Sequence, residues 1–324
     1  MGRRSTFLVP TILALALGAC ADDGTETGDA ARSATTGAPS PVETTAPTFP
    51  VTIQTATGEV IIEARPERIV SLSPTATEML FAIGAGEQVA AVDDQSTYPP
   101  EAPTTELSGF EPNVEAIAGY EPDLVVYATE AGDLGSSLSG LGITTLVQPA
   151  AAMLDDVYDQ IGELGLATGN VAEAEDLVSS MREEVEAITS SIEPPAEPVT
   201  FFHELDDTYY SVTSSTFIGQ LYALAGLENI ADAADDTGGG YPQLSAEYIV
   251  DADPDLIFLA DTKCCGQSLR TVSRRPGWDR ITAVRTGNVI ELDDDVASRW
   301  GPRVVEYLRE IAEAVAAVEE ARAA

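Results

Sequence analysis

The feature that most constrains this chain is a motif that occurs twice in its 324 residues. Residues 115–128 and 247–260 align without a gap, and six of the fourteen pairs are identical. Each copy follows a glycine–aromatic pair, Gly109-Phe110 or Gly240-Tyr241. Two similar α/β lobes would explain this repeat. Chance similarity between two short strand–helix units is the alternative.

Short apolar segments alternate with helical patterns along the chain. Two alternating segments, 51–56 and 59–64, flank Thr57-Gly58 and predict a hairpin. A strand over 68–72 should lead into a helix that Ser73 caps and Pro74 opens. Further strands are expected at 89–92, 124–127 and 144–147. This alternation predicts α/β layers around largely parallel sheets.

The middle of the chain has a helical apolar period from Val171 to Ile192, which Pro194 and Pro195 end. We therefore predict a connecting helix over 153–193, between an N-terminal lobe (51–152) and a C-terminal lobe (194–324). The second lobe should end in an amphipathic helix that begins near Pro302. Two lobes joined in this way leave a cleft, and clefts between domains are preferred sites for small ligands.

The first twenty residues have the pattern of a secretory signal peptide. Arg3 and Arg4 precede an apolar run over 7–17 that is too short to cross a bilayer. The sequence at 17–20 resembles a bacterial lipobox, in which the cysteine, here Cys20, is lipidated and becomes the new N-terminus. An ordinary signal peptide with an incidental cysteine is the alternative.

Residues 21–50 are rich in Thr, Ala, Pro, Gly and Asp, which predicts a flexible tether. We expect an extracytoplasmic protein that meets the bacterial cell membrane only through its lipid anchor.

The chain has a formal charge of −38, with 54 acidic and 16 basic residues. Such a surface argues against nucleic acid and anionic lipid as partners. It favours solubility, for example in a salty habitat, or the repulsion of anionic ligands.

The sequence has no motif typical of catalysis. It contains neither a Gly-x-Ser-x-Gly elbow nor a P-loop, and His203 and the three cysteines are not spaced for zinc. We expect a binding protein with no metal site or cofactor of its own. An enzyme or a surface scaffold on the same fold are the alternatives.

Six segments, in the same order, resemble the iron-chelate and vitamin B12 class of ABC-importer binding proteins. They are 68–78, 98–100, 113–117, 121–124, 275–278 and 293–303. The resemblance implies the type III fold: two Rossmann-like lobes joined by a single long backbone helix, with the ligand cleft between them. It also implies a monomer that captures a metal chelate, either a ferric siderophore or cobalamin, and delivers it to permease and ATPase subunits. The metal would arrive inside the bound chelate.

The resemblance also implies site residues. Glu115 and Glu247 match the acidic residue that each lobe presents to the permease. Both glutamates also favour the helix dipole, since Asn113 and Ser245 can cap the helices that carry them.

Phe110 and Tyr241 fall where B12-binding members place aromatic side chains against the ligand, and Tyr210 lies near another such position. Packing within a lobe is the alternative for each. Asp295 and Arg299 match polar residues of the same site, with an internal salt bridge as the alternative. Trp300 is next to them in the sequence.

The sequence does not identify the chelate. Gln95 and Ala128 depart from the cobalamin pattern, and the acidic run 293–295 disfavours an anionic tricatecholate. A neutral or cationic hydroxamate chelate, or cobalamin, fits better, and haem stays open.

Cys264 and Cys265 follow an apolar strand pattern, at the end where α/β proteins collect ligand loops. In an oxidising compartment they can form a vicinal disulfide. Free thiols, or disulfides to another molecule, are the alternatives.

Overall fold

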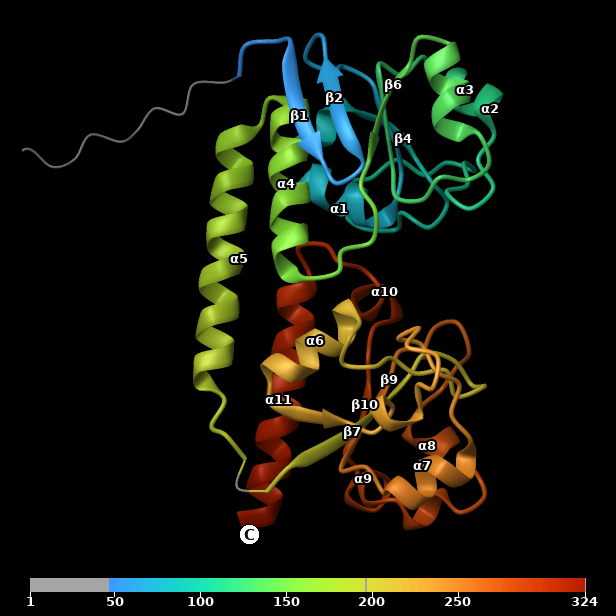
Figure 1. The fold of residues 1–324 in the computed structure, drawn as a ribbon, viewed down its shortest axis with the longest axis vertical. Coiled ribbons are helices and arrows are strands. Elements are labelled where there is room, and N and C mark those ends of the chain that lie inside the picture. Colours follow the sequence, from blue (N-terminus) through green and yellow to red (C-terminus); the bar gives the residue numbers. More distant parts are fainter. Residues whose placement is uncertain (1–46, 196, 324) are drawn as a thin grey trace, which may run out of the picture. The chain divides into compact units, whose positions relative to one another are not determined.

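The computed structural model describes residues 47–195 and 197–323 (Figure 1). The predicted signal peptide over 1–20, with Cys20, lies outside the described residues. So does the predicted tether, except for residues 47–50, which form neither helix nor strand. In the described part of the chain, no helix is both long enough and apolar enough to cross a membrane.

The first lobe contains the predicted hairpin and a four-stranded parallel sheet. β1 (Val51–Thr55) pairs antiparallel with β2 (Gly58–Ile62). The sheet has the order β4-β3-β5-β6 and consists of β3 (Ile69–Leu72), β4 (Val89–Val92), β5 (Leu124–Tyr127) and β6 (Thr144–Val147). Its helices are α1 (Pro74–Ala82), α2 (Val114–Ala118) and α3 (Leu134–Gly140). Ser73 caps α1 as predicted, because its side chain accepts the N–H of Ala76.

The second lobe repeats this topology. Its parallel sheet has the order β8-β7-β9-β10, from β7 (Val199–Glu204), β8 (Leu227–Asn229), β9 (Leu256–Leu259) and β10 (Val289–Glu291). Its shorter helices are α6 (Phe217–Leu224), α7 (Ala246–Ala252), α8 (Leu269–Val272), α9 (Thr282–Thr286) and α10 (Asp294–Ala297). The predicted terminal helix is α11 (Val304–Ala323).

The sequence repeat corresponds to equivalent parts of the two lobes. Its copies form α2–β5 and α7–β9. The aligned residues Glu121, in the turn after α2, and Asp253, which ends α7, both have a left-handed φ, of 52° and 47°. Asp123 and Asp255 each accept backbone N–H groups at the start of the first strand of their sheet. The prediction of two similar α/β lobes is therefore confirmed.

The predicted extent of the connecting helix is wrong. Two helices, α4 (Leu154–Thr168) and α5 (Val171–Ser191), occupy the range 153–193 and lie side by side (Figure 1). α4 ends at Gly169, whose φ of +81° lets the chain reverse where a side chain would cost energy. Asn170 then donates its side-chain N–H to the Ile83 carbonyl oxygen at 2.8 Å, which holds the reversal against the first lobe. Only α5 leads on to the second lobe.

The central strands β5 and β9 are apolar and buried along their whole length, which is typical of a parallel sheet covered on both faces. Leu124 and Val126 of β5 enter a core cluster that also receives Leu256 and Phe258 of β9. This cluster contains residues of both lobes and of α1, α4, α5, α6 and α11. The alternate residues of β5 and β9 pack into two separate clusters, one in each lobe. Because the faces are covered, the strand ends are where polar side chains can gather.

Candidate ligand-binding site

Three of the predicted ligand residues are exposed aromatic side chains. Phe110 is 82% exposed, Tyr241 53% and Tyr210 41%. Packing within a lobe therefore does not account for them. Large aromatic side chains usually bury most of their surface, so exposure of this size is informative.

The two glycine–aromatic pairs occupy corresponding places in the lobes. A Cβ on Gly109 would lie 2.6 Å from the carbonyl oxygen of Leu72, the last residue of β3. A Cβ on Gly240 would lie 2.8 Å from the side chain of Thr216, which caps α6. Each aromatic loop thus packs where the first strand of its sheet passes into the first helix. Only glycine permits so close an approach.

Tyr210 and Tyr241 are close together within the second lobe. Tyr210 forms an antiparallel bridge with Gln243, and the N–H of Ser211 donates to the Pro242 carbonyl oxygen at 2.9 Å. The two tyrosines therefore lie on paired backbone segments, whereas Phe110 belongs to the first lobe.

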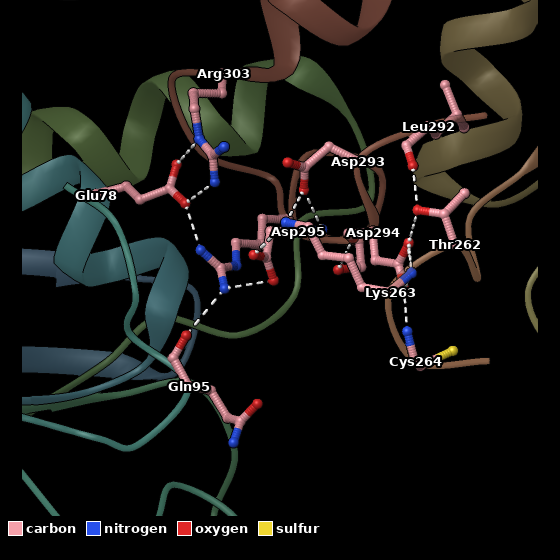
Figure 2. A network of polar contacts seen from close by, with 12 residues as sticks. Glu78, Gln95, Thr262, Lys263, Cys264, Leu292, Asp293, Asp294, Asp295 and Arg303 are labelled. Atoms are coloured by element: carbon pink, nitrogen blue, oxygen red, sulfur yellow. Dashed lines mark hydrogen bonds and ion pairs between the residues drawn. The ribbon is translucent and has the colours of Figure 1, made fainter. Parts of the chain in front are cut away.

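Arg299 lies in a polar network that joins the two lobes. Figure 2 shows Glu78, Gln95, Asp295 and Arg303 of this network. Its guanidinium donates to the Glu78 carboxylate at 2.8 Å and to the Gln95 carbonyl oxygen at 2.9 Å, both in the first lobe. Arg303 donates to the same carboxylate. Glu78 is only 3% exposed, so this is a buried ion-pair cluster.

The internal salt bridge between Asp295 and Arg299 is present, at 2.9 Å. Asp295 also pairs with Lys263, the only lysine of the chain, which contacts Asp293 as well. The cations of this network are thus already neutralised by carboxylates of the chain. Ligand binding by Asp295 and Arg299 stays a prediction.

Trp300 is half-buried and packs against the core that both lobes share. Its indole N–H donates to the Gln160 side chain of α4 at 3.0 Å. This position gives Trp300 a structural role, and its contact with a ligand stays a prediction.

Cys264 and Cys265 are free and exposed, so the vicinal disulfide is not formed in the structure and stays a prediction. They lie in the turn that follows β9. The pKa of Cys264 is raised to about 12 by desolvation, by its hydrogen bond with Cys265 and by the nearby carboxylates of Asp294 and Asp261.

Sequence reasoning missed a second buried cluster at the strand ends. Glu204, the last residue of β7, forms a bidentate ion pair with Arg275. Asp261, which follows β9, is fully buried, and neither of its carboxylate oxygens has a hydrogen-bond partner among the described residues. Desolvation, followed by the neighbouring Glu204, raises the pKa of Asp261 to about 8. An acidic residue directly after an apolar strand was the available signal.

Glu115 and Glu247 are exposed and occupy matching positions, each the second residue of its helix. The Asn113 side chain accepts the N–H of Ala116, and the Ser245 side chain accepts the N–H of Tyr248. The predicted caps are therefore confirmed. Permease docking stays a prediction.

The pockets around the described residues include four with volumes of about 480 to about 1100 Å³. None of the four is lined by a predicted ligand residue. The described residues also contain no group of three or more His, Cys, Asp or Glu side chains placed to hold a metal ion.

Comparison with known proteins identifies the family. The model of a family described as periplasmic binding protein matches residues 69–296. An ABC transporter substrate-binding lipoprotein of Bacillus subtilis, YvrC, is 34% identical over 277 residues, which are 82% of this chain and 86% of the relative. The chain belongs to the periplasmic binding protein family.

A second relative is a cobalamin-binding protein of Halobacterium salinarum, 34% identical over 276 residues, 82% of this chain and 74% of the relative. Among solved structures, the periplasmic heme-binding protein RhuT of Roseiflexus is 26% identical with a TM-score of 0.69, covering 78% of this chain and 99% of that one.

These relatives confirm three predictions for this periplasmic binding protein. The chain has the two-lobed fold of the type III class, it serves as a substrate-binding protein of an ABC importer, and it is not an enzyme.

Proposed function

We propose that this protein captures a neutral or cationic metal chelate outside the cytoplasm, with cobalamin as the preferred ligand, and delivers it to an ABC importer. The observation that carries the proposal is the set of exposed aromatic side chains at the strand ends, Phe110, Tyr210 and Tyr241. The cobalamin-binding relative at 34% identity supports the same ligand class. The metal would enter within the chelate, so the protein needs no cofactor of its own.

An aromatic surface suits a large, flat ring system. Burying one such side chain against a ligand stabilises the complex by roughly 1.5–3 kcal/mol, because apolar surface leaves water. A polyanionic chelate would instead need free cationic donors. Lys263, Arg299 and Arg303 are already paired with carboxylates, and the chain as a whole carries a charge of −38.

Isothermal titration of the chain without residues 1–20 tests the ligand class. The panel contains cyanocobalamin, a ferric trihydroxamate, a ferric tricatecholate and haemin. We expect cyanocobalamin to bind most tightly. Binding of the tricatecholate alone would contradict the proposal, and so would binding of none of the four.

Single variants then test the aromatic site. Phe110→Ala and Tyr241→Ala should each weaken cyanocobalamin binding about tenfold to hundredfold, the equivalent of about 1.4–2.7 kcal/mol. Leu141→Ala is the control, because Leu141 is a 59% exposed apolar side chain outside the proposed site. It should leave the affinity unchanged.

Delivery to the permease is proposed to use Glu115 and Glu247. Their matching exposed positions would let each lobe present one carboxylate to a membrane subunit. The double variant Glu115→Lys/Glu247→Lys should lose ligand uptake by cells and keep its affinity for the ligand. Glu183→Lys/Glu320→Lys makes the same change of charge on α5 and α11 and should transport normally. Normal uptake by the first double variant would refute the docking role.

The remaining parts of the proposal concern the anchor and the monomer. Cys20→Ser should move the protein from the membrane fraction into the soluble extracytoplasmic fraction, because it removes the acceptor of the lipid. Light scattering of the chain without residues 1–20 should give the mass of one copy.

A further inference from the structure

We propose that Cys264 and Cys265 form a thiol–disulfide site whose closure weakens ligand binding. The site differs from the aromatic surface above and uses side chains that have no part in the packing of the lobe. Its effect on the ligand rests on the proposed function, and its redox chemistry does not.

The position of the two thiols favours this role. They lie in the turn between β9 and α8, at the carboxyl end of a central strand, where open α/β sheets bind ligands. Both side chains are exposed. Cysteine is normally among the most buried residue types, so two adjacent exposed cysteines do not serve as small core residues.

The backbone holds the turn without any help from the sulfur atoms. The Asp294 carboxylate accepts the N–H of Lys263 at 3.0 Å and the N–H of Cys264 at 2.9 Å (Figure 2). The Asp261 carbonyl oxygen accepts the N–H of Cys265 at 3.2 Å. The thiols are therefore presented by a turn that is already anchored on both sides.

The chemistry needs an oxidant, which a low-molecular-weight disulfide such as oxidised glutathione supplies. The Cys265 thiolate attacks a glutathione sulfur and displaces one glutathione thiolate, whereas the raised pKa of Cys264 keeps that thiol protonated at this stage. The second cysteine attacks the resulting mixed disulfide and displaces the other. One S–S bond breaks in glutathione and one forms between Cys264 and Cys265. The protein thereby loses two hydrogen atoms, and two glutathione thiols are produced.

Formation of the disulfide would affect the polar network between the lobes through Asp294. The eight-membered ring would impose new dihedral angles on Cys264 and Cys265. This change would strain the hydrogen bonds that their N–H groups donate to the Asp294 carboxylate and the Asp261 carbonyl oxygen. Asp294 adjoins Asp295, which pairs with Arg299. Arg299 in turn contacts Glu78 and Gln95 of the first lobe. Loss of one such hydrogen bond should weaken cyanocobalamin binding about fivefold, the equivalent of about 1 kcal/mol.

The experiment treats the chain without residues 1–19 with oxidised glutathione and measures both mass and affinity. Trypsin cleaves after Lys263 and Arg270 and releases both cysteines in one peptide, 264–270, separate from Cys20. We expect this peptide to become lighter by two hydrogen atoms and to regain them with a reductant. An unchanged mass, or only glutathione adducts, would overturn the site.

Affinity for cyanocobalamin is measured before and after oxidation. A fivefold weakening that a reductant reverses supports the coupling, and equal affinities of the closed and open forms overturn it. The double variant Cys264→Ser/Cys265→Ser retains the backbone anchors and should bind alike with and without the oxidant. If the reduced protein binds no cyanocobalamin, the proposed ligand has failed, whereas the peptide mass still decides the redox site.

Discussion

Glu78→Gln should lower the free energy of unfolding by about 3 kcal/mol. The Glu78 side chain lies on α1 of the first lobe and is 2% exposed. Its carboxylate accepts hydrogen bonds from two guanidinium groups near the end of the second lobe, Arg299 at 2.8 Å and Arg303 at 2.9 Å. A neutral amide cannot balance two guanidinium charges, and its NH2 group would face one of them.

The size of the effect follows from burial. The side chains of Arg299 and Arg303 are 9% and 14% exposed, and removing one partner of a buried ion pair costs about 3–5 kcal/mol. In the variant, Arg299 keeps its hydrogen bonds to the Asp295 carboxylate and the Gln95 carbonyl oxygen. Arg303 keeps its cation–π contact with Tyr98, in which its Cζ atom lies 4.3 Å from the ring centroid. These remaining contacts place the expected cost at the lower end of that range.

Urea denaturation followed by circular dichroism measures the change, at constant m-value. The matched control is Glu184→Gln, which breaks the exposed ion pair with Arg309, where the side chains are 49% and 47% exposed. An exposed pair contributes at most about 1 kcal/mol. If Glu78→Gln costs no more than this control, the buried network does not stabilise the fold as argued.

Two other changes test the burial and packing of the second lobe. Asp261 stays protonated in the fold, with its pKa raised to about 8 by desolvation and then by Glu204, but ionises near its ordinary pKa of 3.8 in the unfolded chain. Unfolding therefore releases a proton, and stability should fall by up to about 1.4 kcal/mol per unit as the pH rises from about 4 to about 8. Asp261→Asn should flatten this slope between about pH 6 and 8 in urea titrations, and an unaltered slope would refute the assignment. A Cβ at Gly219 would overlap the Thr213 carbonyl oxygen, so Gly219→Ala should cost more than about 2 kcal/mol, whereas Gly162→Ala, in open space on α4, should add about 0.5–1 kcal/mol. Thermal melts measure both glycine variants, and a neutral Gly219→Ala would show that the helix can shift to relieve the overlap.

Local signals predicted the elements of this fold well. Strands β4, β5 and β6 match their expected ranges, because each apolar run is only four residues long, too short for a typical helix, and contains β-branched residues. The repeat predicted a lobe topology that occurs twice. Ser73, Asn113 and Ser245 all cap helices, because a cap depends only on residues three positions apart.

Local signals did not predict the break between α4 and α5. The helical period continues on both sides of Gly169, so periodicity alone does not distinguish one long helix from two that pack together. The φ of +81° at Gly169 and the contact of Asn170 with Ile83 decide the reversal. The second of these joins residues that are 87 positions apart.

The sequence by itself therefore determined the two lobes, the alternation of strands and helices within them, and the capped first turns of α2 and α7 that carry Glu115 and Glu247. Tertiary structure alone decided the partners of the buried charges. Arg299 meets Glu78 across 221 positions of sequence, and Asp261 comes to lie against Glu204. No local pattern specifies such pairs, because their energy comes from the low polarity of a site that exists only once both lobes have folded.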